Sequence, residues 1–441
     1  MDLSKLLPAL VQHKIAARPG LARIIDNLGW LLLDKLLRMV GGLLVGVWVA
    51  RYLGPEQFGL FNYASAFVVL FTAIAVLGLN PIIVRELVQH PEHEGAVLGT
   101  GFVLQLIGSL VALTLMTVLI WLLRENDEVV RYIVVIMGIG MVIKSADVIR
   151  YWFEAHVISR YTVWTDNAAF VLASVAKVYL ILNGGRLVDF AWVALGEIVV
   201  ATVLLVFVFL KINRQRAGWR VVKTHASALL GRSWPLLLSG LTITIYMKID
   251  QIMLGQLADD REVGIFSAAL RISEIWYFLP MIVVTSVYPS LLRSDQADGA
   301  RFDRDMLRLL RALVVMALMV ALPIWLLADQ IIELLYGESF RGAAPVLAIH
   351  IWTSVFVFLG VAGGRWYVVK GLERLTFART LLAACLNVAL NLKLIPLWGA
   401  VGAAVASLVA QAMSGVLFNA FTARTRPLFF LQCRSLISRL N

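Results

Sequence analysis

The chain has 441 residues, of which 60% are apolar and only 15% are charged, and its mean hydropathy is +0.84. This composition excludes a soluble globular domain and indicates an all-helical protein that crosses a membrane many times. Two cysteines are too few for a disulfide scaffold or a four-cysteine metal site.

The N-terminal segment, residues 1–28, has an amphipathic pattern. Apolar residues at positions 3, 6, 7, 10 and 11 share one helical face, with Lys5 and Lys14 on the opposite face. We therefore expect residues 2–16 to form a helix on the cytoplasmic membrane surface. Charges between positions 14 and 23 interrupt the apolar run, so a cleaved signal peptide is not expected.

The first predicted span, residues 29–51, contains three charged residues, Asp34, Lys35 and Arg38. Charges within a span are costly and usually face protein or water. Asp34 and Arg38 are four residues apart, and Gly42 and Gly46 continue the same stripe. The stripe has two interpretations: an Asp34–Arg38 ion pair that packs the span against a neighbouring helix, or part of a cationic cavity. The ion pair does not account for Lys35, so Lys35 favours the cavity.

Apolar runs predict twelve spans and divide the chain into two lobes. An N-terminal lobe at 29–210 and a C-terminal lobe at 234–422 are joined by a basic linker at 211–233, and a basic tail follows at 423–441. The predicted spans are 29–51, 59–80, 98–123, 129–150, 161–182, 187–210, 234–256, 263–291, 309–328, 343–369, 376–395 and 399–422.

The distribution of positive charge predicts the topology. With the N-terminus inside, cytoplasmic segments hold 25 of the 39 Lys and Arg residues, as the positive-inside rule requires. Both termini are then cytoplasmic. The net charge of +11 indicates this orientation and contact with anionic lipid, and no nucleic-acid-binding motif accompanies it.

The sequence also contains an internal repeat. Residues 53–64, LGPEQFGLFNYA, return as residues 257–269, LADDREVGIFSAA, so that Gly59 and Phe61 correspond to Gly264 and Phe266. Six spans per repeat predict two lobes of the same orientation, related by an axis along the membrane normal, with a central cavity between them.

Four segments carry a resemblance to a known family: ARYLGPEQFGLFNYASAF, KIDQIMLGQLADDREVGIFSAALRISE, YGESFRGAAPVL and LNVALNLKLIPLWGAVGAAVAS. Together they resemble the polysaccharide transporter family, the Wzx-like flippases of the multidrug/oligosaccharidyl-lipid/polysaccharide exporter superfamily. The resemblance implies a V-shaped, two-lobed fold in the bacterial cytoplasmic (inner) membrane. It also implies alternating-access transport of undecaprenyl pyrophosphate-linked glycans, for O-antigen, capsule or exopolysaccharide assembly, with a polysaccharide polymerase and chain-length proteins as candidate partners. Twelve spans, rather than fourteen, favour this branch over the peptidoglycan lipid flippase.

The resemblance implies a cationic cavity to which spans 1 and 8 contribute basic residues. Lys35 and Arg38 match the contribution of span 1, and Arg271 matches that of span 8. Arginine and lysine suit a pyrophosphate, because arginine binds it through two parallel hydrogen bonds and lysine acts as a point charge. Lys144 and Lys248 are further candidates for this cavity.

A structural role competes with the binding role of Arg271. Asp250 and Arg271 lie at equal depth on either side of the turn between spans 7 and 8, so a simple ion pair is the favoured interpretation, with Glu274 as a second partner. The two roles are compatible if the pair opens when an anion arrives.

Four acids are candidates for ion pairing or for coupling to a cation: Asp34, Asp250, Glu274 and Glu197. Glu197 lies near the middle of span 6 and is the leading candidate for proton or cation binding, although protonation or a bond to a neighbouring helix is the more ordinary role. A pair with Lys177 requires the two side chains to bridge a difference in depth.

Two further polar groups have simpler interpretations. Asn387 and Asn391 share one face of span 11 and are expected to bond across helices. The segment HPEHE at 90–94 is not expected to bind a metal, because Pro91 prevents a regular helical ligand face.

Three functional classes follow from these patterns. A lipid-linked oligosaccharide flippase is favoured, and a cation-coupled multidrug extruder is the alternative, although it should line its cavity with acids and aromatic residues. An integral-membrane glycosyltransferase or polymerase is disfavoured by the short loops. The chain is therefore expected to be a transporter rather than an enzyme, with no cofactor.

Overall fold

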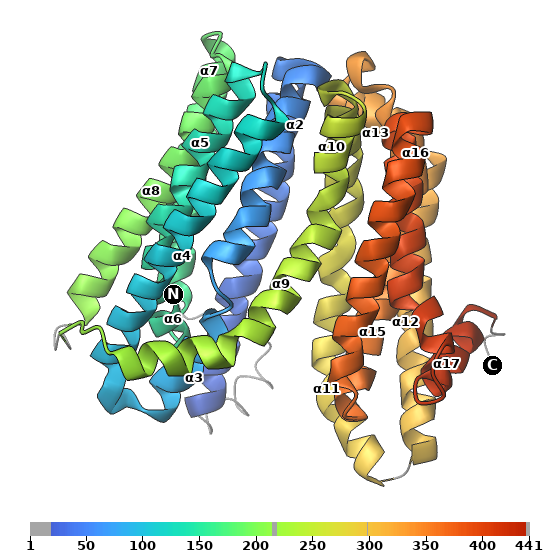
Figure 1. Cartoon of the computed structure of the whole chain (residues 1–441). Helices are drawn as coiled ribbons and strands as arrows, with labels where there is room; N and C mark the ends of the chain where they lie inside the picture. The colour runs from blue at the N-terminus through green and yellow to red at the C-terminus, as the bar shows by residue number, and fades with distance from the viewer. Residues whose placement is uncertain (1–18, 214–217, 298, 438–441) are drawn as a thin grey trace. The chain divides into compact units, whose positions relative to one another are not determined.

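The computed structural model of the chain describes residues 19–213, 218–297 and 299–437 (Figure 1). Every regular element in these ranges is a helix, which confirms the all-helical class. The predicted interfacial helix at 2–16 lies outside the described residues.

The chain divides into two compact units, which are residues 1–52 with 64–241 and residues 53–63 with 242–441. In the first unit, α8 packs against both α5 and α7. Besides parts of the shared helices α2 (Pro19–Ala75) and α9 (Lys223–Leu257), the first unit contains α3 (Asn80–Gln89), η2 (Pro91–His93), α4 (Glu94–Leu123), α5 (Glu128–Ile143), η3 (Lys144–Asp147), α6 (Val148–Ala155), α7 (Arg160–Leu182) and α8 (Leu187–Ile212).

The second unit has its apolar core among α11, α12, α15 and α17. Besides residues 53–63 of α2 and the end of α9, it contains α10 (Asp260–Glu274), η4 (Ile275–Tyr277), α11 (Phe278–Ala297), α12 (Gly299–Leu326), α13 (Ala328–Tyr336), η5 (Glu338–Phe340), α14 (Ala343–His350), α15 (Thr353–Val369), α16 (Glu373–Gly415), η6 (Leu417–Ala420) and α17 (Arg426–Ile437).

The described residues contain ten helical stretches that are long and apolar enough to cross a membrane. Two of them each hold two of the predicted spans, because α2 kinks at Gly54 and α16 kinks at Gly399. Their φ values of +71° and +54° lie in the left-handed region that glycine adopts most readily. The twelve predicted spans are therefore all present as helical segments.

Two predicted spans contain a short 3₁₀ segment, which holds Lys144 and Asp147 in the first and follows Glu274 in the second. The span predicted at 129–150 runs through α5, η3 and α6, and the span predicted at 263–291 runs through α10, η4 and α11. A 3₁₀ turn inside a long helix often marks strain or function. These turns lie next to the charged groups described below.

The two copies of the repeat pack against each other within the second unit. A Cβ atom placed on Gly59 would lie 1.6 Å from the carbonyl oxygen of Asp260, and one placed on Gly264 would lie 1.9 Å from that of Pro55. Pro55 and Asp260 each lie four residues before the glycine of their own copy. The repeat therefore forms a symmetric crossing that admits no side chain at either glycine.

Candidate functional site

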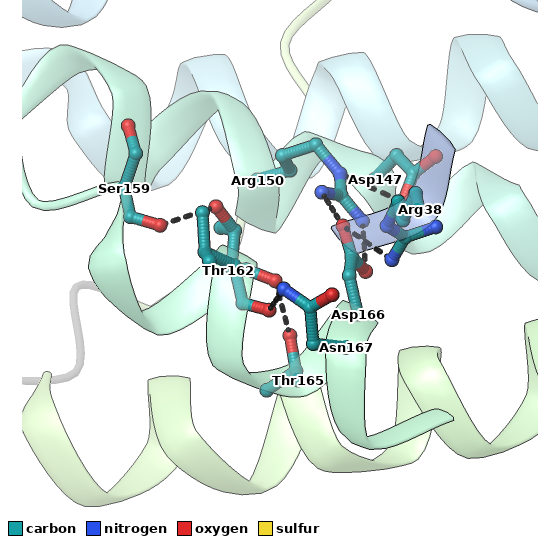
Figure 2. A network of polar contacts seen from close by, with 9 residues as sticks. Arg38, Asp147, Arg150, Ser159, Thr162, Thr165, Asp166 and Asn167 are labelled. Carbon is teal, nitrogen blue, oxygen red and sulfur yellow. Dashed lines mark hydrogen bonds and ion pairs between the residues drawn. The ribbon is translucent and has the colours of Figure 1, made fainter. Parts of the chain in front are cut away.

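A bidentate ion pair lies at the centre of the polar network in the first unit (Figure 2). Arg150 of α6 donates from Nη1 and Nη2 to the two carboxylate oxygens of Asp166 on α7, at 2.6 and 2.9 Å. Asp147, at the end of η3, lies 3.6 Å from Nε of Arg150. Arg150 therefore lies between two acids, Asp147 and Asp166.

Arg38 of α2 reaches the same carboxylate. Its Nη2 atom lies 3.8 Å from Oδ2 of Asp166, and its guanidinium lies 5.8 Å from the ring centre of Phe170. Asp34 lies in α2, but its side chain is outside the described residues, so the Asp34–Arg38 pair stays a prediction. Lys35 is exposed.

This network borders a cavity of about 320 Å³. Lys144 is exposed to it and forms no ion pair with any residue that the structure describes. Asp147, Arg150 and Asp166 contribute the polar wall, and α8 contributes Glu197, Ile198, Ala201 and Thr202. The cavity therefore combines paired charges with one unpaired ammonium group.

Glu197 has a direct partner. Lys177 of α7 donates to its carboxylate at 3.3 Å, and both side chains are about three-quarters or more buried. The difference in depth along the two helices is bridged by the length of the lysine side chain. The sequence suggested that Glu197 is an acid without a basic partner, and the structure instead pairs it with Lys177.

The second unit holds a buried carboxylate with neutral partners. Asp250 of α9 is 5% exposed and accepts hydrogen bonds from Asn391, at 2.5 Å, and from Ser407, both on α16. Asn391 also donates to Asn387 at 3.1 Å. The bond between Asn391 and Asp250 confirms the prediction that the asparagines of span 11 bond across helices.

The predicted Asp250–Arg271 pair is wrong. Arg271 of α10 instead lies 5.3 Å from the ring centre of Phe58, and it forms no ion pair with Asp250 or Glu274. Equal distance from a turn fixes depth but not direction around a helix. Asp250 faces α16, whereas Arg271 faces the α2 segment of its own unit.

A small enclosed cavity of about 20 Å³ borders Asp250. Glu274, His350 and Tyr246 also border it, and neither Glu274 nor Lys248 forms an ion pair with a residue in the described ranges. Tyr246 Oη and Asn391 Oδ1 are buried without a hydrogen-bond partner. The volume suits one water molecule or one small cation, and an ionised Asp250 would favour the cation.

Two residues of the first network were missed by sequence reasoning. Arg150 was counted among the cytoplasmic charges because it ends a predicted span, and Asp166 was not singled out. The available signal was an acid within the span predicted at 161–182, where Thr162, Thr165 and Asn167 add a polar stripe. In the structure each of these three residues bonds to a carbonyl of its own α-helical region.

No group of three or more His, Cys, Asp or Glu residues among those described is arranged to hold a metal ion. The network of the first unit is instead suited to binding an anion, because its guanidinium and ammonium groups border an open cavity. The buried Asp250 is suited to a proton or a monovalent cation.

Comparison with known proteins gives two family matches. A model described as polysaccharide biosynthesis protein matches residues 24–294, which is more than half of the chain. A second model, described as MatE, matches residues 235–392.

Two relatives from Haloferax volcanii are named as flippases. The chain is 28% identical to "Probable flippase AglR" over 257 residues, which cover 56% of this chain and 52% of that protein. It therefore spans about half of that relative's length. It is 22% identical to "Probable low-salt glycan biosynthesis flippase Agl15", covering 83% of this chain and 77% of that protein.

Two solved structures share the fold. The lipid II flippase MurJ in an inward closed conformation aligns with a TM-score of 0.68 at 14% identity, covering 92% of this chain and 90% of that one. An inward-facing multidrug resistance MATE family transporter of the MOP superfamily aligns with a TM-score of 0.66 at 15% identity, covering 92% and 97%. Both confirm the all-helical, two-lobed fold class.

Proposed function

Because this chain belongs to the polysaccharide biosynthesis protein family, we propose that it is a flippase for a lipid-linked oligosaccharide. The substrate is an undecaprenyl pyrophosphate-linked glycan, which moves by alternating access from the cytoplasmic to the periplasmic leaflet. Such transport serves assembly of a surface polysaccharide, such as O-antigen, capsule or exopolysaccharide. The names of the two relatives support the flippase activity.

The open cationic cavity of the first unit is the observation that carries this proposal. Its charged groups and the partner of Glu197 comprise the cations Arg38, Lys144, Arg150 and Lys177 and the acids Asp147, Asp166 and Glu197. The described lining itself has three cations and three acids, and Lys177, outside the lining, pairs with Glu197, which leaves the Lys144 ammonium group without an acid partner among the described residues. A pyrophosphate first meets the ammonium group of Lys144 and then competes with Asp166 for the guanidinium groups of Arg150 and Arg38.

In the second unit, Arg271 and Lys248 supply further cations for the glycan's pyrophosphate. Neither forms an ion pair with an acid in the residues that the structure describes, and the Arg271 guanidinium contacts the ring of Phe58. Asp250 and Glu274 are the candidate coupling acids. Anionic lipid contacts the basic cytoplasmic segments, and polymerase and chain-length proteins act downstream.

The experiment compares glycan-lipid translocation with drug efflux in proteoliposomes that contain the purified chain. We expect translocation of a fluorescent lipid-linked glycan and no drug efflux. A Lys35→Gln, Arg38→Gln, Lys144→Gln triple variant should lower the translocation rate at least several-fold, because Arg38 and Lys144 line the polar cavity and Lys35 is an exposed cation on the same helix as Arg38.

Arg308→Gln is the matched control, because Arg308 is 76% exposed and its ion pair within the described residues is with nearby Asp305. Thermal stability of each variant separates loss of transport from loss of fold. Unchanged translocation in a folded triple variant would reject the cationic cavity, and drug efflux without glycan translocation would favour the multidrug alternative.

A further inference from the structure

The second unit contains a cavity where three of its helices meet. It has a volume of about 660 Å³ and is lined by the start of α12, the end of α15 and the turn that leads into α17. These helices pack against one another (Figure 1). Asp303 of α12, Trp366 of α15, Lys370 directly after α15 and Arg424 before α17 supply its polar side chains. The cavity is therefore built from segments that lie far apart in the sequence.

The lining residues place this cavity at a membrane surface. The predicted spans 343–369 and 399–422 end one residue before Lys370 and two residues before Arg424. The polar headgroup layer covers about 5 to 7 Å on each side of the hydrocarbon core, so both cations lie at its level. A lipid headgroup can therefore reach the cavity from the membrane.

Helix α17 has the character of a helix that lies in this layer. Leu428 and Leu431 are buried in the apolar core of the unit, whereas Phe430 is 58% exposed. Arg426 and Arg434 are exposed on the same helix. A helix that presents an aromatic side chain together with arginines is typical of a membrane interface. The wall of the cavity next to α17 is therefore also at the level of lipid headgroups.

The cavity holds polar groups to which the described part of the chain gives no partner. Trp366 is only 3% exposed, and its indole Nε1 has no hydrogen-bond partner. Arg424 and Asp303 are exposed and form no ion pair with any residue that the structure describes. Buried donors are nearly always paired in folded proteins. The indole N–H of Trp366 therefore indicates an acceptor that the chain does not supply.

Lys370 is positioned by two contacts. Its Nζ atom donates to Oδ1 of Asp295 at 2.6 Å and lies 4.6 Å from the ring centre of Phe302. The side chain remains 34% exposed. Among the described residues, the lining thus has one unpaired cation, one unpaired acid and one cation that is paired with an acid outside the lining.

A buried hydrogen-bond network fixes the segment that carries Arg424. Tyr367 of α15 donates to Oδ1 of Asn419 at 2.6 Å, and Nδ2 of Asn419 donates to Oε1 of Gln432 on α17 at 2.8 Å. The hydroxyl of Thr425 donates to the carbonyl oxygen of Asn419 at 2.9 Å. The backbone next to Arg424 is therefore held against α15, so the cavity is formed before any ligand binds.

We propose that this cavity binds the headgroup of a zwitterionic phospholipid with a primary ammonium group, such as phosphatidylethanolamine. The phosphate accepts hydrogen bonds from Arg424, Lys370 and the indole N–H of Trp366, and the ammonium group donates to Asp303. This site is independent of the proposed function, because none of its residues is among the candidates for binding the glycan lipid.

The acid in the lining decides between classes of headgroup. Asp303 repels a headgroup that carries only negative charge, such as that of phosphatidylglycerol, and attracts an ammonium group. A choline headgroup is also zwitterionic, but its trimethylated nitrogen has no N–H to donate to a carboxylate. The bound lipid joins α12, α15 and α17, and a ligand that binds only the folded chain raises its stability.

The test measures lipid binding to the full chain, purified in detergent and freed of lipid. The probes are phosphatidylethanolamine, phosphatidylglycerol, phosphatidylcholine and free phosphoethanolamine. Native mass spectrometry counts the bound molecules, and scanning fluorimetry measures the unfolding temperature. We expect phosphatidylethanolamine to bind at least several-fold more tightly than the other three and to raise the unfolding temperature the most.

Two variants separate the two charges of the headgroup. Asp303→Asn should remove the preference for phosphatidylethanolamine over phosphatidylglycerol, and Arg424→Gln should weaken binding of both lipids several-fold. Both positions are exposed, so both variants should fold. The controls are Asp329→Asn, at an exposed acid of α13, and Arg304→Gln, at an exposed cation next to Asp303 in sequence but outside the lining. Neither control should change the preference.

Three outcomes would overturn the proposal. Equal binding of phosphatidylglycerol or phosphatidylcholine would show that the cavity does not distinguish headgroups. A preference for phosphatidylethanolamine that persists in folded Asp303→Asn would remove the acid from the site. Equal binding of free phosphoethanolamine would replace the lipid with a soluble ligand. If Asp303→Asn does not fold, the comparison of the four probes on the unaltered chain still decides.

Discussion

The two units differ in how they accommodate a carboxylate within a predicted membrane span. In the first unit, Asp166 is held by two arginines beside a cavity of about 320 Å³. In the second, Asp250 is held by a serine and an asparagine beside a cavity of about 20 Å³. We therefore expect the first arrangement to exchange one anion for another, and the second to accept a proton, a water molecule or a small cation.

This difference predicts which unit depends on charge for its stability. Removing one partner of a buried ion pair leaves an uncompensated charge, whereas neutralising an acid held by neutral groups does not. The largest expected effect therefore lies in the first unit.

Arg150→Gln should destabilise the protein more than the other single changes discussed here. A fully buried pair would cost about 3 to 5 kcal/mol when broken, and this one should cost less because its side chains are 27% and 18% exposed. Thermal unfolding measured by scanning fluorimetry checks the change. The double variant Arg150→Gln, Asp166→Asn should recover part of the lost stability, because it also removes the acid that Arg150→Gln leaves without its partner.

Arg131→Gln is the control in the same unit, because Arg131 contacts the ring of Trp121 rather than an acid. A double variant no more stable than Arg150→Gln would show that the pair itself does not hold α6 and α7 together. The first half of the comparison would then fail.

Asp250→Asn should leave the folded yield nearly unchanged and abolish any dependence of transport on a cation gradient. An asparagine keeps an oxygen that accepts from Asn391 and an amide that can donate to Ser407. Asp250→Ala removes both bonds and should cost about 1 to 3 kcal/mol. Comparing the thermal stability of the two variants separates charge from hydrogen bonding.

If Asp250→Asn were as destabilising as Asp250→Ala, the charge itself would be structural and the two units would be alike. A cation response retained in a folded Asp250→Asn variant would move the coupling role to Glu274 or Glu197.

The patterns that repeat along the chain predicted the fold well. Apolar runs gave the helical segments, and the correspondence of Gly59 with Gly264 appears in the structure as a symmetric crossing. Such features depend on length, hydropathy and local sequence, which one chain displays directly.

The pairing of charges was less predictable. Depth in the membrane can be counted from a turn, and this suggested Asp250 with Arg271. Direction around each helix depends on packing, and packing placed Asn391 and Ser407 against the acid instead. Arg150 was overlooked for a related reason, because a charge at the end of a span is normally assigned to solvent.

The smallest structural effect is expected at Glu197, and it tests the driving force. Glu197 and Lys177 are 25% and 20% exposed, so their pair should contribute about 1 kcal/mol or less. Glu197→Gln should therefore fold normally, which scanning fluorimetry checks. Because Lys177 already neutralises this acid, the variant should also keep its response to membrane potential.

That response follows from the charge of the substrate. Outward movement of a pyrophosphate is favoured by about 2.3 kcal/mol per charge per 100 mV when the interior is negative, and the empty cationic cavity is drawn back inward. In proteoliposomes with potential and ion gradients set independently, an inside-negative potential alone should accelerate outward flipping, in the unaltered chain and in Glu197→Gln. If flipping ignored potential, needed a proton or sodium gradient and vanished in Glu197→Gln, then Glu197 would be the coupling acid. The contrast between an anion-exchanging first unit and a cation-binding second unit would then no longer hold.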